Sequence, residues 1–205
     1  MTEQCLLNHD RNPDLNREQI EENLRNYLGC DTVIWLEHGV YLDETKGHTD
    51  NFCRFVAPGE VILTWTDDQN DPQYPISTAA LMRLNVAADA HGRKLTVHKL
   101  YQPSPVLISA AEAAGVDQVE GTLPRTEGDR LAASYVNFYI ANGVIVMPAF
   151  DDPMDLPAQQ SLAKLFPSRK IIAVPGREIL LGGGNVHCIT QQQPLALPAS
   201  LRSVA

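Results

Sequence analysis

The stretch NFCRFVAPGEVILTW, residues 51–65, decides the fold class, because it predicts two apolar strands joined by the turn Ala57-Pro58-Gly59. A second stretch, YVNFYIANGVIVM, covers residues 135–147 and contains Asn-Gly, a favoured pair in hairpin turns. The Asn-Phe pairs of the two stretches lie 86 residues apart, and their turn glycines lie 84 apart. These spacings favour two copies of one hairpin-based unit over a chance similarity of two apolar hairpins.

A helix and a further strand are predicted after each hairpin. Apolar periodicity places a helix at residues 76–91 and a strand at 95–100. After the second hairpin, the helix that contains Leu162 stops before Pro167, and residues 170–174 form the strand. Each copy therefore has the order strand, strand, helix, strand, which is typical of a repeated supersecondary unit arranged around an axis.

The two ends of the chain do not complete this unit. A helix with a capping box is expected at residues 16–28 and a strand at 32–36, before the first hairpin. A last strand is expected within residues 180–190. Incomplete units would leave sheet edges uncovered, so we expect a piece of the fold to be missing on the N-terminal side.

The composition indicates a globular protein with an acidic surface. Apolar residues make up 44% of the 205 residues, and 16 Lys and Arg stand against 25 Asp and Glu, a formal charge of -9. This charge opposes binding to phosphate backbones and anionic membranes and favours a cationic small molecule, although acidity also serves solubility. We expect no nucleic acid and no membrane as partners.

The four cysteines show no CxxC spacing, and the first four residues do not resemble the start of a signal peptide. We therefore expect reduced thiols and a cytoplasmic protein. No stretch approaches the roughly 18 apolar residues that a membrane span requires.

The densest candidate for chemistry is LGGGNVHCIT, residues 181–190, where three glycines precede an expected short strand with His187 and Cys188. A phosphate-binding loop is disfavoured, because no Lys-Ser/Thr pair and no helix follow. Cys188 is instead a candidate nucleophile, against the alternative of an ordinary buried cysteine. If the segment is a strand, His187 faces away from Cys188 and is structural.

A cysteine nucleophile needs a proton acceptor, and GHTDN, residues 47–51, offers His48. In an extended segment, His48 and Asp50 point to the same side and share one pocket. Asp43 and Glu44 add negative charge ahead of it. The alternative is a surface histidine in a turn. The zinc spacings of Cys and His pairs are absent, so we expect no metal.

Three motifs together carry a family resemblance. GGGNVHCITQQQP at residues 182–194 resembles the nucleophile segment of agmatine deiminases. GHTDNFC at residues 47–53 resembles the catalytic His-x-Asp strand of that family, and WTDDQNDPQY at 65–74 resembles the loop that follows it. Three long motifs in the same order are far more specific than one cysteine or histidine.

The resemblance implies a pentein, an α/β fold in which five ββαβ units form a propeller. The chain would then be one partial catalytic domain, residues 1–205, without roughly the first two of the five units. Its approximate units would be 1–36, incomplete, then 37–115, 130–176, and 177–205, again incomplete.

The resemblance also implies a reaction and its residues. Agmatine and water would give N-carbamoylputrescine and ammonia, a step of putrescine and polyamine biosynthesis, without any cofactor. Cys188 would be the nucleophile and His48 the acid and base, while Asp50 would hold the guanidinium. Glu44 or Asp43 would meet the far amine, and Gly183 and Gly184 would bring the backbone close to the substrate.

Two further interpretations stay open at this stage. The chain could be an inactive truncated remnant, because acidic residues of the family's N-terminal region are absent. It could also be a deiminase of another guanidino compound, such as peptidyl-arginine. For an active agmatine deiminase, the expected partner is a small cationic substrate, agmatine. Association into a homo-oligomer is compatible with the sequence.

Overall fold

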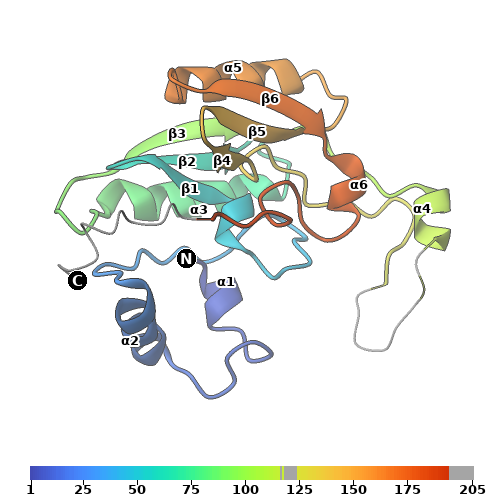
Figure 1. Ribbon diagram of the computed structural model, residues 1–205. Coiled ribbons are helices and arrows are strands. Elements are labelled where there is room, and N and C mark those ends of the chain that lie inside the picture. Colours follow the sequence, from blue (N-terminus) through green and yellow to red (C-terminus); the bar gives the residue numbers. More distant parts are fainter. Residues whose placement is uncertain (116, 118–123, 194–205) are drawn as a thin grey trace.

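The computed structural model describes residues 1–115, 117 and 124–193, which form a mixed α/β fold with two small sheets (Figure 1). The elements follow one another as α1 (Glu3–Leu6), α2 (Arg17–Leu28), the 3-10 helix η1 (Thr49–Asn51), β1 (Cys53–Ala57), β2 (Glu60–Trp65), α3 (Gln73–Val86), β3 (Thr96–Tyr101), α4 (Ala110–Ala114), β4 (Tyr139–Ala141), β5 (Val144–Ala149), α5 (Asp155–Leu165), β6 (Lys170–Pro175) and α6 (Arg177–Leu180).

The first sheet has the order β1-β2-β3, with β1 antiparallel and β3 parallel to the central strand. Successive residues of β2 face opposite sides of the sheet. Val61 and Leu63 pack in one core with Leu84 of α3. Ile62 belongs instead to the core that the second sheet shares. The strand is therefore apolar at consecutive positions because both faces of this sheet are covered.

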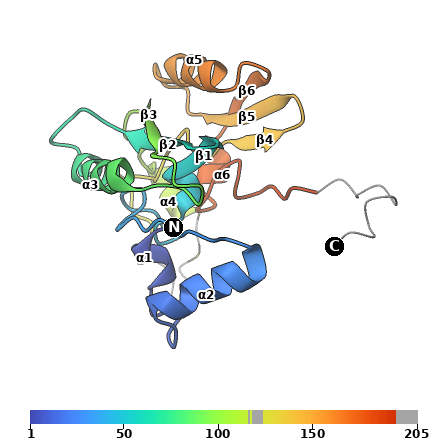
Figure 2. The same ribbon diagram turned by 90° about the vertical axis from the view of Figure 1, so that its left-hand side faces the viewer.

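The second sheet repeats the arrangement of the first. Its order is β4-β5-β6, again with an antiparallel hairpin and then a parallel strand that follows a helix, α5. Figures 1 and 2 show α5 on the outer side of this sheet and α3 on the outer side of the first one. Phe138 joins the two sheets, because Arg54 of β1 donates to its carbonyl oxygen and stacks on its ring at 4.5 Å.

Most predicted elements are confirmed, with small shifts at their ends. The capping box of α2 is present, and Gly29 ends that helix in the left-handed conformation. The helix expected at residues 76–91 begins and ends earlier, since Ala87 is already extended. The 3-10 turn η1 delays the start of β1 to Cys53.

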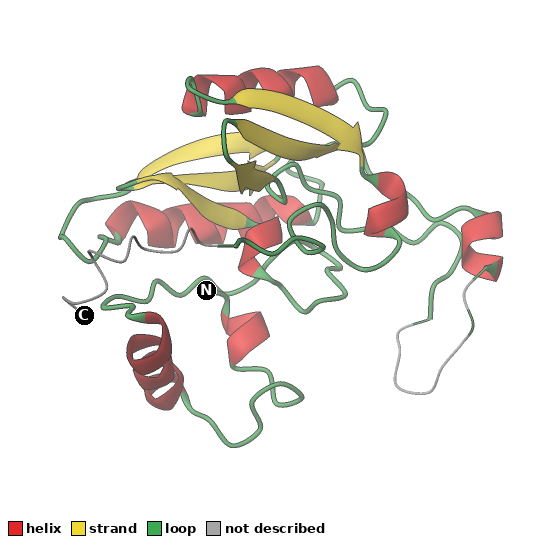
Figure 3. Cartoon of the chain, viewed as in Figure 1, coloured by secondary structure: helices red, strands yellow, loops and turns green. Residues whose placement is uncertain are grey.

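Two predicted strands are wrong. In residues 32–36 only Leu36 pairs, in a single bridge to Thr2, so this segment is a loop (Figure 3). The expected strand around His187 and Cys188 is a series of turns after α6. Both segments contain β-branched or apolar residues, which favour a strand. In the segment around His187 and Cys188, the turn-forming glycines and asparagine of residues 182–185 outweigh this preference for a strand.

Within the described residues, none of the helices has the length and apolar character needed to cross a membrane. All four cysteines are free.

Candidate functional site

The thiol of Cys188 lies in a polar cradle made by residues far away in the chain. Asn137 donates a hydrogen bond from Nδ2 to the sulfur at 3.2 Å, and the thiol lies 3.4 Å from Oδ2 of Asp50, to which it can donate. Asn137 precedes β4 and is fully buried. The residue Cys188 itself is exposed and lines a surface pocket with Gly184 and Ile189.

The glycine run before Cys188 is required by close packing. A Cβ on Gly184 would lie 2.8 Å from Cβ and 3.0 Å from Sγ of Cys188, closer than side chains can approach. Gly183 has a φ of +86°, and a Cβ there would lie 3.2 Å from a carboxylate oxygen of Glu44. The two glycines thus bring backbone up to the thiol and to Glu44.

Asp50 contacts the C-terminal loop through one oxygen. Its Oδ2 atom lies 2.7 Å from Nδ1 of His187 and 3.4 Å from the sulfur of Cys188. The prediction that His187 faces away from the site is wrong, because the segment turns instead of forming a strand. The backbone N-H of His187 also donates to Oδ1 of Asn137 at 2.9 Å. His187 therefore joins Asp50 and Asn137.

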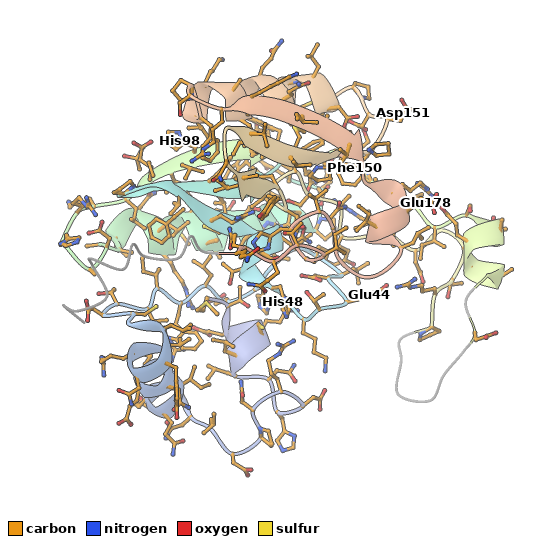
Figure 4. The ribbon with its side chains drawn as sticks, in the orientation of Figure 1. Glu44, His48, His98, Phe150, Asp151 and Glu178 are labelled. Carbon is orange, nitrogen blue, oxygen red and sulfur yellow. The ribbon has the colours of Figure 1, made fainter. Side chains whose placement is uncertain are left out.

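His48 directly precedes the 3-10 helix that contains Asp50. The expectation of an extended segment here is wrong, because Thr49–Asn51 is a 3-10 helix. Nε2 of His48 lies 2.9 Å from Nη2 of Arg11, and because an arginine only donates, the imidazole nitrogen accepts. Figure 4 shows His48 below the first sheet, on the side of α1.

The loop before His48 places a carboxylate in a small cavity of about 270 Å³. Asp43 is only 8% exposed, and its Oδ1 accepts from the N-H and hydroxyl of Thr45 at 2.9 and 2.7 Å. Among the residues that the structure describes, its Oδ2 has no hydrogen-bond partner. Burial raises the pKa of Asp43, although the Thr45 contacts and His48 oppose this effect.

Glu44 lines the same cavity but has a partner. Arg125 donates to its two oxygens, with distances of 3.1 Å from Nε and 2.8 Å from Nη2. Arg125 also donates to the carbonyl oxygen of Leu181, at the start of the glycine run. This arginine therefore ties the loop of Asp43 and Glu44 to the loop of Gly183 and Gly184, which line the cavity too.

The protonation states of the thiol and carboxylate are coupled. Desolvation raises the pKa of the Cys188 thiol, and the charge of Asp50 adds to this, while hydrogen bonds from Asn185 and Asn137 lower it. Burial pushes the pKa of Asp50 upward, but the hydrogen bonds with His187 and Cys188 and the electrostatic effects of nearby groups outweigh burial and leave it below the usual value. The site thus combines a protonated thiol with an ionised carboxylate.

Three residues of this site were not identified from the sequence: Asn137, His187 and Arg125. Asn137 had a signal, because it occupies the same place in the second hairpin stretch as Asn51 in the first. The contact of His187 depends on a turn that the strand prediction excluded. Nothing in the sequence around Arg125 pointed to Glu44, 81 residues earlier. In the described part of the chain, no three His, Cys, Asp or Glu side chains are grouped to hold a metal ion.

A free thiol is held by an amide and a carboxylate, and the imidazole of His187 contacts the same carboxylate. These groups define a candidate cysteine-hydrolase site. Residues 1–194 match the model of the Porphyromonas-type peptidyl-arginine deiminase family, and the chain belongs to this family. The agmatine deiminase of Ectopseudomonas mendocina (strain ymp) is 60% identical over 193 residues, which are 94% of this chain and 52% of that protein. The chain thus spans about half the length of the curated relatives it matches.

Solved structures agree with this assignment. The agmatine deiminase of Enterococcus faecalis superposes with a TM-score of 0.90 at 45% identity, over 95% of this chain and 53% of that one. A C315S agmatine deiminase of C. jejuni with substrate bound gives a TM-score of 0.73 at 28% identity, over 91% of this chain and 49% of that one.

Asp50 and Asn137 have opposite effects on the pKa of the Cys188 thiol. Asp50→Asn should lower the pKa of the thiol, because the negative charge and its hydrogen bond favour the protonated form. Asn137→Ala should raise it, because the amide donor stabilises the thiolate. The pH dependence of iodoacetamide alkylation at Cys188, followed by mass spectrometry, measures both. Shifts of the two variants in the same direction would contradict the described geometry.

Proposed function

We propose that the chain carries the catalytic half-site of an agmatine deiminase, which converts agmatine and water into N-carbamoylputrescine and ammonia. The observation that supports this most directly is the contact of the Cys188 thiol with the side chains of Asp50 and Asn137. The names and identities of the relatives favour agmatine over other guanidino compounds.

In the first step, the thiol proton of Cys188 passes to His48, and the sulfur attacks the central carbon of the guanidinium group. The carbon-nitrogen bond to one amino group breaks, and the departing ammonia takes its proton from His48. The product of this step is an amidino group bound to the sulfur. Water, deprotonated by His48, then adds to the same carbon, and the carbon-sulfur bond breaks to return the thiol and release N-carbamoylputrescine.

Electrostatics support a role for the substrate in activating its own nucleophile. Without a cation, desolvation and, to a smaller extent, the charge of the ionised Asp50 raise the pKa of the thiol and favour its protonated form. A guanidinium bound to Asp50 would neutralise that charge and place a positive group beside the sulfur, and both effects lower the pKa of the thiol. The planar guanidinium also suits paired hydrogen bonds to a carboxylate. Asp50 would thus bind the substrate, and the thiolate would form mainly after the substrate is bound.

The two acids of the preceding loop differ in what they can offer a cation. Glu44 is already bound on both oxygens by Arg125. Asp43 lines the same cavity, and among the described residues its buried Oδ2 has no hydrogen-bond partner. We therefore favour Asp43 as the carboxylate that meets the far amine of agmatine, while Glu44 and Arg125 hold the loops. Gly183 and Gly184 would allow the substrate to pass close to the backbone.

For the architecture, we propose two complete ββαβ units at residues 37–115 and 130–176, with incomplete units at 1–36 and 177–205, as part of a five-unit propeller. The equal order of elements in the two sheets supports this arrangement. The last unit extends beyond the described residues. The cytoplasmic location and the possibility of a homo-oligomer stay predictions from the sequence.

Turnover of agmatine by the 205-residue chain tests the proposed function. We expect release of ammonia and N-carbamoylputrescine, and a loss of roughly 10⁴-fold or more in Cys188→Ala, because the nucleophile is removed. Cys30→Ala, which removes another exposed thiol, is the matched control and should keep its activity. Equal rates in Cys188→Ala and the unchanged chain would overturn the mechanism, and no release from either would make this chain an inactive remnant.

A comparison of two substrates tests the assignment of Asp43. Asp43→Asn should raise KM for agmatine by about tenfold or more, since hydrogen bonds to charged groups contribute this much. It should leave KM for butylguanidine, which lacks the far amine, nearly unchanged. The same experiment with Glu44→Gln should affect both substrates alike, through the loop. If Asp43→Asn weakens the two substrates equally, Asp43 does not contact the amine.

A further inference from the structure

His187 is a polar residue of the site to which neither the sequence nor the proposed mechanism gives a role. Its imidazole is 30% exposed and its partner Asp50 21%, so the contact is largely shielded from solvent. The distance of 2.7 Å between Nδ1 and Oδ2 is that of a hydrogen bond to a charged group. Because an ionised carboxylate only accepts, Nδ1 carries the proton in this contact.

The backbone fixes the imidazole in this position. The N-H of His187 donates to Oδ1 of Asn137 at 2.9 Å and approaches the carbonyl oxygen of the same residue at 3.2 Å. Its own carbonyl oxygen accepts from the N-H and the hydroxyl of Thr190, at 3.0 and 2.7 Å. His187 is thus anchored on the second sheet and reaches across to a residue that precedes the first sheet.

We propose that His187 is a positioning residue, which holds the Asp50 carboxylate by Oδ2 and thereby fixes the plane in which the carboxylate meets the guanidinium of the substrate. This inference rests on the proposed function, because it assigns Asp50 to substrate binding. The thiol of Cys188 shares the same Oδ2 atom. Without His187, this thiol contact alone would hold the carboxylate, and the orientation of its plane would be less constrained.

The contact also bears on the charge of Asp50. Burial favours the neutral acid, and the hydrogen bond from His187 is the largest of the effects that lower the pKa of Asp50. Loss of this donor therefore raises the pKa of Asp50. As the pH falls, the carboxylate is then protonated at a higher pH than in the unchanged chain. The titratable or charged groups whose electrostatic effects couple to Asp50 are Cys5 of α1, Asp43 and His48 of the preceding loop, Arg54 of β1, and His187 and Cys188.

Two substitutions separate positioning from simple packing. His187→Ala removes the donor, whereas His187→Asn keeps an N-H donor near the place of Nδ1. We expect His187→Ala to raise KM for agmatine by roughly tenfold or more with a change in kcat below about threefold, and the rise to grow toward acidic pH. His187→Asn should restore KM to within about threefold.

His98→Ala is the matched control, because His98 on β3 makes a similar contact with Glu60, at 2.8 Å. Figure 4 shows His98 at the end of the molecule away from Glu44, so its loss should leave KM unchanged. An unchanged KM in His187→Ala, or a defect in His187→Asn as large as in His187→Ala, would overturn the proposal.

A second measurement does not depend on turnover. The carbon-13 resonance of the Asp50 carboxyl, followed against pH by NMR, should titrate at higher pH in His187→Ala than in the unchanged chain and close to the unchanged chain in His187→Asn. Coincident titrations in all three would show that His187 does not hold Asp50. If the unchanged chain releases no ammonia, the proposed function fails, and this titration alone still decides the role of His187.

Discussion

The contact of Asp50 with the loop of His187 and Cys188 brings together residues 137 and 138 positions apart. Asp50 sits in the 3-10 turn that leads into β1, and the partner loop follows α6, after the second sheet. The position of the thiol relative to the carboxylate therefore depends on how the two sheets pack. Arg54 and the shared core around Ile62 and Phe138 hold that packing.

The two sheets place their polar residues by the same local rule. An asparagine precedes the first strand of each hairpin, and its amide reaches across to the neighbouring part of the chain. Asn51 donates to the carbonyl oxygen of Ala132 at 3.0 Å, and Asn137 donates to Cys188. The first hairpin thus supplies a structural amide, and the second supplies an amide that contacts the thiol.

The sequence predicted the sheets and their helices because hydrophobic periodicity and turn residues act locally. It also singled out Cys188, Asp50 and Asp43, which the structure gathers around the glycine run. It failed where a contact depends on loop geometry. The left-handed residues Leu42 and Lys46, with φ of 58° and 62°, shape the loop of Asp43 and Glu44, and side chains other than glycine rarely signal this conformation. Two other features depend on loop geometry and therefore leave no periodic pattern in the sequence. They are the pairing of Glu44 with Arg125 and the turn that directs His187 to Asp50.

The central claim is that the sulfur of Cys188 forms a covalent bond to the guanidinium carbon. Intact-mass measurement of the chain after acid quenching during reaction with agmatine tests it most directly, with peptide mapping to locate any adduct. We expect one added aminobutyl-substituted amidino group per chain, on Cys188, that disappears when agmatine is consumed. Turnover without any adduct on Cys188, or an adduct confined to another residue, would contradict it.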